Sequence, residues 1–101
     1  MQLQDLQPWL QPWARWMLSR FPELQLTSTR RSYLQQVELW QAYLRGESKY
    51  PAAPPGRSLH EQGRAWDMVG PSWLLAAAGR VWESVGGRWG GRFGDPIHFE
   101  Y

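Results

Sequence analysis

Two short stretches of the sequence place a histidine near an aspartate, and they contain the only two histidines of the chain. His60 precedes Asp67 in SLHEQGRAWD, and His98 follows Asp95 in GDPIHFEY. The chain has no cysteine, so disulfides and thiolate zinc sites are excluded and a metal would need histidine and carboxylate ligands. Two imidazoles and one carboxylate, from His60, His98 and Asp67, are typical of catalytic zinc, which keeps a further position for water.

The residues around these ligands alternate as they do in strands. In GRAWD, strand geometry directs Asp67 to one face, beside very small residues, and Trp66 to the other. In IHFEY, the same rule places His98 and Glu100 on one face and apolar residues on the opposite one. Each strand would then offer a ligand to a shared face and apolar side chains to a core. By spacing alone, a satisfied polar histidine and a solvated aspartate remain the more common interpretation.

Hydrolysis at such a site needs a general base within hydrogen-bond reach. Asp95 stands shortly before His98, and Pro96 favours an extended conformation for it. We therefore expect Asp95 to act as the base and then as the acid that protonates the leaving amine. Zinc would lower the pKa of water toward about 7. The glycines of GGRWGGRFG are either simple turns or places where the backbone approaches a substrate.

The rest of the chain predicts the elements that would position these residues. LQLTST alternates like a strand, and Ser32 with Gln35 forms the capping-box pattern of a helix that ends near Gly46. PSWLLAAAGRVWESVGG predicts a second helix, and the proline-rich GESKYPAAPPGR predicts a loop. Helices and short strands without βαβ alternation favour an α+β fold, with a small antiparallel sheet and flanking helices.

The length predicts a single domain over residues 1–101, with one hydrophobic core. Within it, residues 1–21 form a Trp- and Pro-rich segment whose apolar residues share a helical face. The helix would begin or kink at Pro12. We interpret it as a packing helix, because an interfacial membrane helix should carry more Lys and Arg on its polar face.

Charge and hydropathy exclude several classes of partner. The net charge is only +2 and the arginines are scattered, so we expect no nucleic acid partner. No apolar run approaches the roughly 20 residues of a membrane helix, so we expect no membrane partner. The N-terminus MQLQDLQPWL lacks the pattern of a secretory signal, which predicts a protein made in the cytoplasm without a signal peptide.

Three motifs in a fixed order resemble a known family. SLHEQGRAWD fits the pattern Ser-x-His-x-x-Gly-x-Ala-x-Asp, and DPIHFE, preceded by WGGRFG, fits a closing Asp-x-x-His motif. STRRSYLQQ is similar to an upstream Ser-x-x-Arg-Ser motif that ends in glutamine. In these features the chain resembles the VanY-type zinc D-alanyl-D-alanine carboxypeptidases and the related phage L-alanyl-D-glutamate endopeptidases, which are peptidoglycan metallopeptidases. The N-terminal segment matches no family feature.

The resemblance implies a hedgehog/DD-carboxypeptidase-like zinc peptidase fold with Zn2+ as cofactor. His60, Asp67 and His98 would be the zinc ligands, and Asp95 the catalytic acid and base. Arg31 would be catalytic through its guanidinium, which would steady the scissile carbonyl or a substrate carboxylate. Three further motif positions would contact substrate or support the site from behind, namely Ser28, Gln36 and Ser58.

These features together predict a monomeric zinc metallopeptidase that hydrolyses an amide bond in the peptide stem of bacterial peptidoglycan. The bond could be that of a D-Ala-D-Ala carboxypeptidase or of an L-Ala-D-Glu endopeptidase. The compact chain favours an endolysin-like phage or prophage protein that reaches the cell wall after phage-mediated release. Two alternatives remain: a non-catalytic peptidoglycan- or metal-binding module on the same fold, and an interaction protein that binds a partner through its tryptophans.

Overall fold

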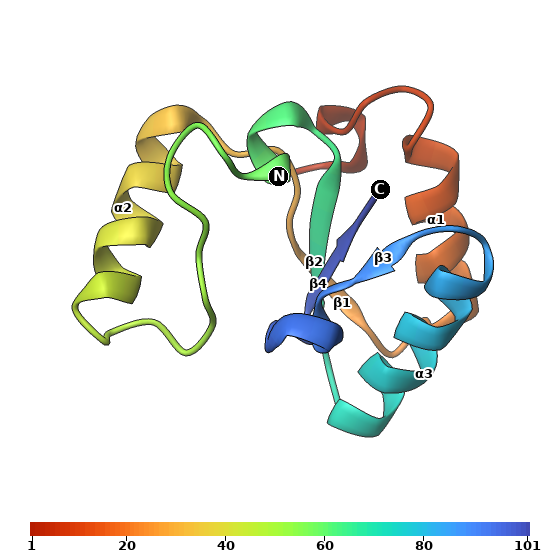
Figure 1. Cartoon of the computed structure of the whole chain (residues 1–101). Helices are drawn as coiled ribbons and strands as arrows, with labels where there is room; N and C mark the ends of the chain where they lie inside the picture. Colours follow the sequence, from red (N-terminus) through yellow and green to blue (C-terminus); the bar gives the residue numbers. More distant parts are fainter.

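The computed structural model describes the whole chain, residues 1–101, as three helices and one small antiparallel sheet (Figure 1). The helices are α1 (Gln11–Arg20), α2 (Tyr33–Leu44) and α3 (Ser72–Ser84). The strands are β1 (Gln25–Ser28), β2 (Ala65–Val69), β3 (Arg88–Trp89) and β4 (His98–Glu100), in the spatial order β1-β2-β4-β3. Three short 3-10 turns complete the structure: η1 (Leu3–Asp5), η2 (Leu59–Gln62) and η3 (Gly90–Phe93). The expected α+β class is confirmed.

Pairing of β2 with β4 fixes which side chains share a face of the sheet. Asp67 lies opposite His98, and Trp66 lies opposite Phe99, in an antiparallel register. Residues that face each other across such a pair point to the same side of the sheet, and neighbours along a strand point to opposite sides. The sheet therefore carries Asp67 and His98 on one face and the two aromatic rings on the other.

The aromatic face of the sheet packs against α1 and α3 to form the core. Trp66 stacks on Phe99 with ring centroids 5.8 Å apart and meets Trp82 of α3 edge-on at 5.0 Å. All three rings are buried, and so are Leu10 and Met17 from the N-terminal region. The N-terminal segment is thus a packing helix, as expected, and Pro12 lies in its first turn.

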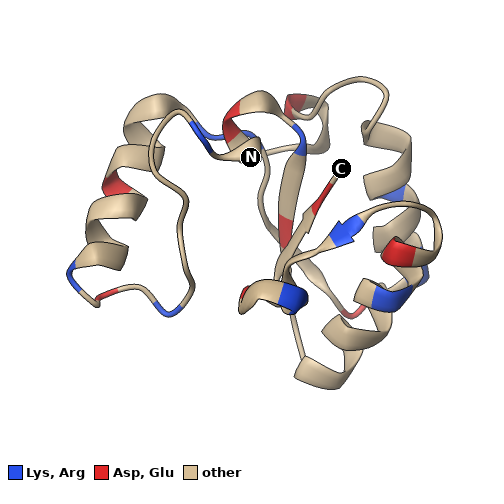
Figure 2. Ribbon diagram, viewed as in Figure 1, with Lys and Arg blue, Asp and Glu red and all other residues tan.

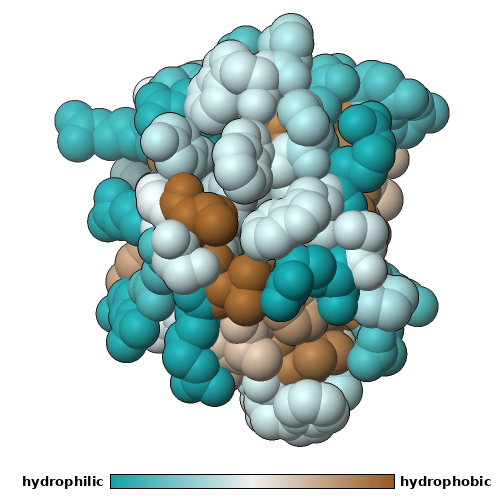
Figure 3. Space-filling model, turned by 90° about the vertical axis from the view of Figure 1, so that its right-hand side faces the viewer, coloured by the Kyte–Doolittle hydropathy of each residue, from teal (hydrophilic) through white to brown (hydrophobic).

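Aromatic side chains also reach the outer side of this layer. Figure 3 shows the side of the molecule where α1 and α3 lie, with apolar side chains set among hydrophilic ones. A shallow hollow of about 200 Å³ on this layer is lined only by apolar and aromatic residues: Trp9, Trp13, Trp82, Val85 and Tyr101. Of the tryptophans that line this hollow, Trp82 is buried, whereas Trp9 and Trp13 are about half exposed.

On the other side of the sheet, α2 stands apart and forms a second wall (Figure 1). Its N-terminus has the predicted capping box, in which Ser32 Oγ accepts from the Gln35 backbone and Gln35 Oε1 accepts from the Ser32 backbone. The loop after α2 returns toward the sheet, and Gln36 Nε2 donates to the carbonyl of Ala53 at 2.9 Å. Because Gln36 is fully buried, it ties the helix to this loop.

One local expectation needs correction. The strand that carries Asp67 begins at Ala65, because Gly63 adopts a left-handed conformation with φ of 67° and ends η2. Gly63 therefore does not share a strand face with Asp67. His60, for which no element was predicted, lies in the 3-10 turn η2.

Charged residues are distributed along the whole chain and do not gather in one element (Figure 2). None of the helices combines the length and the apolar character needed to span a bilayer. The strongest concentration of buried polar groups lies between the sheet and α2, among them Gln36, His60, Asp67 and His98.

Candidate metal centre

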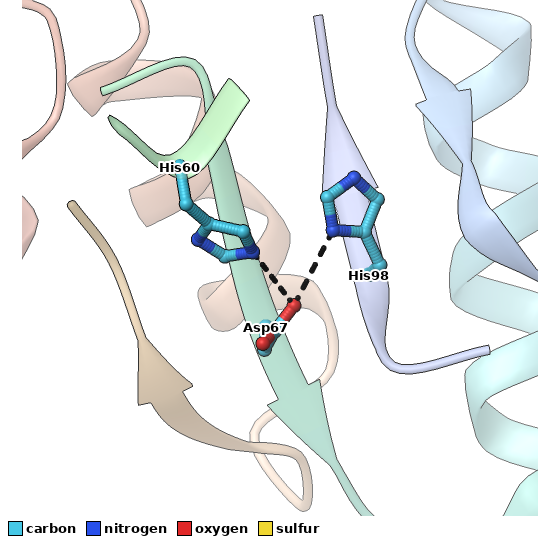
Figure 4. A group of neighbouring side chains, drawn as sticks. All are labelled: His60, Asp67 and His98. Carbon is cyan, nitrogen blue, oxygen red and sulfur yellow. Dashed lines mark hydrogen bonds and ion pairs between the residues drawn. The ribbon is translucent and has the colours of Figure 1, made fainter. Parts of the chain in front are cut away.

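His60, Asp67 and His98 meet on the polar face of the sheet (Figure 4). Nε2 of His60 lies 3.1 Å from Oδ1 of Asp67, and Nδ1 of His98 lies 3.5 Å from the same oxygen. The three side chains come from η2, β2 and β4 respectively. All three are buried, so the group is withdrawn from bulk water. The structure thus brings together the three residues singled out as metal ligands.

The turn that holds His60 also determines which of its ring nitrogens faces Asp67. Ser58 caps η2 by accepting a hydrogen bond from the His60 backbone at 3.2 Å. Nδ1 of His60 lies 2.7 Å from the carbonyl oxygen of Thr29, which can only accept. Nδ1 must therefore carry a proton, and Nε2 is left to face Asp67.

His98 uses the opposite nitrogen. Its Nε2 lies 2.6 Å from Oε1 of Glu100, the next residue on the same face of β4. Nδ1 is thus directed at Asp67. Burial alone would lower the pKa of His98, but hydrogen bonds to Asp67 and Glu100 outweigh it and raise the pKa to about 9.

The second oxygen of Asp67 is held by Arg31. Nη2 of Arg31 donates to Oδ2 of Asp67 at 2.7 Å, so Oδ1 alone faces the two histidines. Burial would raise the pKa of Asp67, but hydrogen bonds from His60 and His98 and the charge of Arg31 hold it far below its usual range. The carboxylate is therefore ionised throughout the neutral range.

The donor set fits a zinc-like cation. One ligand atom from each of His60, Asp67 and His98 lies within 4.8 Å of the others. The outer nitrogen of each ring is bound to an acceptor, so Nε2 of His60, Nδ1 of His98 and Oδ1 of Asp67 direct their electron pairs at one region. These electron pairs repel one another unless a cation or protons lie between them. Two imidazoles and one carboxylate are ligands that zinc accepts, and each imidazole already has the outer hydrogen bond typical of metal-bound histidine.

A large cleft opens over this group, between the sheet and the α2 wall. Its volume is about 1080 Å³, larger than most small-molecule pockets. All eight site residues expected from the sequence line it: Ser28, Arg31, Gln36, Ser58, His60, Asp67, Asp95 and His98. Arg31 links several of these residues, because it also donates to Ser28 Oγ at 3.1 Å and to Gln36 Oε1 at 3.4 Å. The hydroxyl of Ser58, in contrast, is engaged in capping η2.

Asp95 lines the cleft beside the three ligands and has an unsatisfied carboxylate oxygen. Its Oδ1 is buried and has no hydrogen-bond partner. Burial raises the pKa of Asp95 to about 6, with the nearby charge of Asp67 adding to the rise and the charge of His98 opposing it. A carboxylate that is short of partners and has a raised proton affinity is suited to exchange protons with a bound molecule.

Gly90 explains how the Asp95–His98 turn fits against η3. A Cβ added to Gly90 would collide with the backbone oxygen of Asp95 and lie 2.8 Å from Cβ of His98. The Gly90 carbonyl also accepts from the Asp95 backbone at 2.8 Å. This glycine of the WGG stretch therefore allows η3 to lie directly against the turn between Asp95 and His98.

Two partners of the ligands, Glu100 and Thr29, were not predicted from the sequence. Glu100 had a visible signal, because the strand alternation already placed it on the same face as His98. No signal in the sequence marks Thr29, because its backbone carbonyl is the acceptor and a residue of any type at this position would supply that group.

Comparison with models of known protein families gave no match, and comparison with curated protein sequences gave none either. Solved structures do match. The L-Ala D-Glu endopeptidase ChiX of Serratia marcescens is 25% identical, with a TM-score of 0.70 over 97% of this chain and 81% of its own. A vancomycin-resistance D,D-pentapeptidase VanY, in complex with Zn(II), is 15% identical, with a TM-score of 0.72 over 95% of this chain and 72% of its own.

The vancomycin-resistance D,D-dipeptidase VanXYg, in complex with a D-Ala-D-Ala phosphinate analogue, gives a TM-score of 0.71 at 15% identity, over 95% of this chain and 50% of its own. The chain thus has the fold of the peptidoglycan metallopeptidases, and the resemblance inferred from its motifs is confirmed. The 97% coverage by ChiX includes the Trp- and Pro-rich N-terminus, which the motifs alone had left unmatched.

Proposed function

From the fold that this chain shares with the peptidoglycan metallopeptidases, we propose that it is a zinc peptidase acting on the peptide stem of bacterial peptidoglycan. The observation that carries the proposal is the convergence of His60, Asp67 and His98 at the base of a cleft that Asp95 also lines. The cleft, at about 1080 Å³, is large enough for several residues of a peptide.

The contacts of the three ligand residues indicate which of their atoms would hold the metal. His60 Nε2, His98 Nδ1 and Asp67 Oδ1 would hold the zinc ion, because their other polar atoms are already bound to neighbours. Zinc, when bound, supplies a Lewis acid that activates a water molecule and polarises a carbonyl. The buried setting of the three side chains strengthens electrostatic effects there, because water screens them weakly.

Asp95 would carry the proton. Its carboxylate, which lines the cleft, can accept a proton from the attacking water and can then donate that proton to the departing amine nitrogen. A pKa of about 6 leaves the carboxylate ionised at neutral pH, yet more basic than an ordinary aspartate. The water oxygen forms the new C–O bond as the C–N bond breaks, and both protons of the water finish on the departing nitrogen. The products are a carboxylate and an ammonium group, and Asp95 returns to its ionised state.

Arg31 would bind both to neighbouring protein side chains and to the substrate. Three of its five N–H groups are used in bonds to Ser28, Gln36 and Asp67, and these bonds fix the guanidinium plane. The remaining donors can bind the scissile carbonyl or a substrate carboxylate, where a fixed guanidinium stabilises developing negative charge.

The bond between L-Ala and D-Glu is the one that we favour. ChiX is named for cleavage of this bond, and it combines 25% identity with coverage of 81% of its own length. The D,D-peptidases VanY and VanXYg are 15% identical and match over smaller shares of their chains. We therefore propose an endopeptidase, with the D-Ala-D-Ala carboxypeptidase as the alternative.

The proposal is tested by incubating the zinc-loaded protein with purified peptidoglycan and measuring new amino groups. We expect amine release that stops when zinc is chelated and resumes when zinc is returned. Mass spectrometry of products from defined muropeptides identifies the bond: loss of the whole stem beyond L-Ala indicates the endopeptidase, and loss of one D-Ala the carboxypeptidase. Zinc-loaded protein that binds peptidoglycan without releasing amines would instead support a non-catalytic binding module.

A further inference from the structure

Glu100 is a buried carboxylate that the proposed catalytic steps do not use. It lies on β4, two residues after His98, with an exposed fraction of 9%. A buried charge is costly unless it is paired, so its partners should reveal its role. Oε1 lies 2.6 Å from Nε2 of His98, and Oε2 lies 3.5 Å from Nη1 of Arg88 on the neighbouring strand.

The contact with His98 has a consequence for the metal site. A carboxylate can only accept, so Nε2 of His98 must be the protonated nitrogen. The neutral ring then has its electron pair on Nδ1, the atom that faces Oδ1 of Asp67. Without this acceptor, the ring could also adopt the tautomer that is protonated on Nδ1. That tautomer has no electron pair on Nδ1 to offer a metal beside Asp67.

The two histidines are held in their tautomers by different kinds of acceptor. His60 receives its acceptor from the backbone, the carbonyl of Thr29, and therefore offers Nε2. His98 receives its acceptor from a side chain and offers Nδ1. A carboxylate also draws the shared proton more strongly than a carbonyl does, which makes the ring a better electron donor.

The position of Glu100 in the sheet keeps this contact in place. It pairs with Ala65 on β2 and with Arg88 on β3, so its backbone is fixed between two strands. Its carbonyl oxygen accepts from Nε1 of the buried Trp82 at 2.8 Å. The side chain is thus directed to the cleft face by a rigid part of the fold.

We propose that Glu100 is a positioning residue of the metal site, which selects the Nδ1-donating tautomer of His98 and tightens zinc binding. The proposal rests on the proposed function only in taking His60, Asp67 and His98 as the ligands of a metal. It predicts a property of the zinc site that can be measured without any peptidase substrate.

Zinc dissociation constants, measured by competition with a chromophoric chelator, test the proposal. Glu100→Ala should weaken zinc binding by about 10- to 100-fold, the range found when an outer partner of a metal-bound histidine is lost. Glu100→Gln keeps an acceptor without the charge and should fall between Ala and the parent protein. Glu83→Gln is the matched control, because Glu83 also pairs with an arginine but lies on α3, and it should leave affinity unchanged.

A second measurement needs no substitution and guards against variants that fail to fold. In the zinc-loaded parent protein, ¹⁵N NMR of the His98 ring should show a protonated Nε2 and a metal-bound Nδ1. Zinc on Nε2, or zinc affinities of both Glu100 variants equal to that of the parent, would overturn the proposal, as would a parent protein that binds no zinc.

The outcomes also separate this inference from the proposed function. Glu100-dependent zinc binding in a protein that leaves peptidoglycan intact would contradict the peptidase and leave the role of Glu100 standing. Peptidoglycan hydrolysis by Glu100→Ala and Glu100→Gln proteins that both bind zinc as tightly as the parent would support the peptidase and contradict the role of Glu100.

Discussion

Arg31 and Asp67 form an ion pair of 2.7 Å that occupies the one carboxylate oxygen neither histidine contacts. The guanidinium side chain is 18% exposed and the carboxylate side chain 8%, so the pair is largely shielded from solvent. This arrangement leaves a single Asp67 oxygen for a metal and directs it at His60 and His98. It also gives Arg31 a role in shaping the site that does not depend on substrate.

Removing this guanidinium should damage both the metal site and the metal-free fold. Arg31→Ala should weaken zinc binding by about 10- to 100-fold, because Asp67 loses the partner that orients it. It should also lower the free energy of unfolding of the chelated protein by about 3 kcal/mol, since a buried carboxylate loses its charge partner. Zinc competition and denaturant unfolding measure the two effects.

The neighbouring arginine is the matched control. Arg30 is exposed and forms no ion pair, although it too lines the cleft. Arg30→Ala should therefore leave zinc affinity and unfolding free energy near the parent values. Equal effects of the two substitutions, or none from Arg31→Ala, would contradict the assignment of the motif arginine to position 31.

Loss of the Asp95 carboxylate should lower the rate of hydrolysis without loss of the metal. Asp95→Asn is expected to keep one zinc per chain and to lower the rate of amine release by about 100- to 10,000-fold, because the amide cannot carry the proton. Metal analysis and the peptidoglycan assay measure the two properties on the same sample. Glu23→Gln, which changes an exposed carboxylate before β1, should be fully active. An Asp95→Asn protein with most of its activity would refute the assignment.

The metal-free protein should lose stability as the pH rises from about 6.5 to 9. Burial opposes the charged form of His98, but its bonds to Asp67 and Glu100 prevail and raise its pKa from 6.5 to about 9. A raised folded-state pKa stabilises the fold below the unfolded value, and this stabilisation is lost as the pH passes the folded value. The loss is at most about 3 kcal/mol.

Urea unfolding of chelated protein at several pH values measures this change. The zinc-loaded protein should show a much flatter profile across the same window, because the metal replaces the proton on Nδ1. His98→Asn protein, which lacks the titrating ring, serves as the control. A chelated parent protein equally stable at pH 6.5 and pH 9 would show that His98 is not held as a cation in the metal-free fold.

A single methyl group at position 90 should disturb the site from outside the cleft. Gly90→Ala places a Cβ against the backbone oxygen of Asp95 and the Cβ of His98, so the turn between them must move. We expect weaker zinc binding and at least a tenfold lower rate, since small displacements of catalytic groups are costly. Gly56→Ala is the control for an added methyl group, because its Cβ would meet no neighbour, and it should leave zinc affinity unchanged. Parent-like zinc affinity in Gly90→Ala would contradict this close packing.

The parts of the fold predicted correctly are those with local causes. The capping box at Ser32 and Gln35 depends on residues three apart, and the opposite directions of Trp66 and Asp67 follow from strand geometry. The burial of Trp66 against Trp82 agrees with the same alternation. Such features need no knowledge of how distant segments pair.

The parts that were missed depend on pairing across the chain or on backbone groups. Strand alternation predicted that Asp67 and His98 share a face, but it did not predict that they lie directly opposite each other, because this register results from packing of the whole sheet. The 3-10 turn of His60 is too short to give a periodic pattern, although Ser58 is a usable capping signal. The Thr29 carbonyl that orients His60 could not have been foreseen from the side chain at that position.

The central claim is that one metal ion is held by two imidazoles and one carboxylate drawn from η2, β2 and β4. X-ray absorption at the zinc edge, on protein loaded with one equivalent of zinc, tests it most directly. The account predicts two imidazole nitrogens at about 2.0–2.1 Å with oxygen in the remaining shell, and one imidazole fewer in either His60→Ala or His98→Ala. A spectrum with no more than one imidazole in the parent protein, or one unchanged by both substitutions, would contradict it.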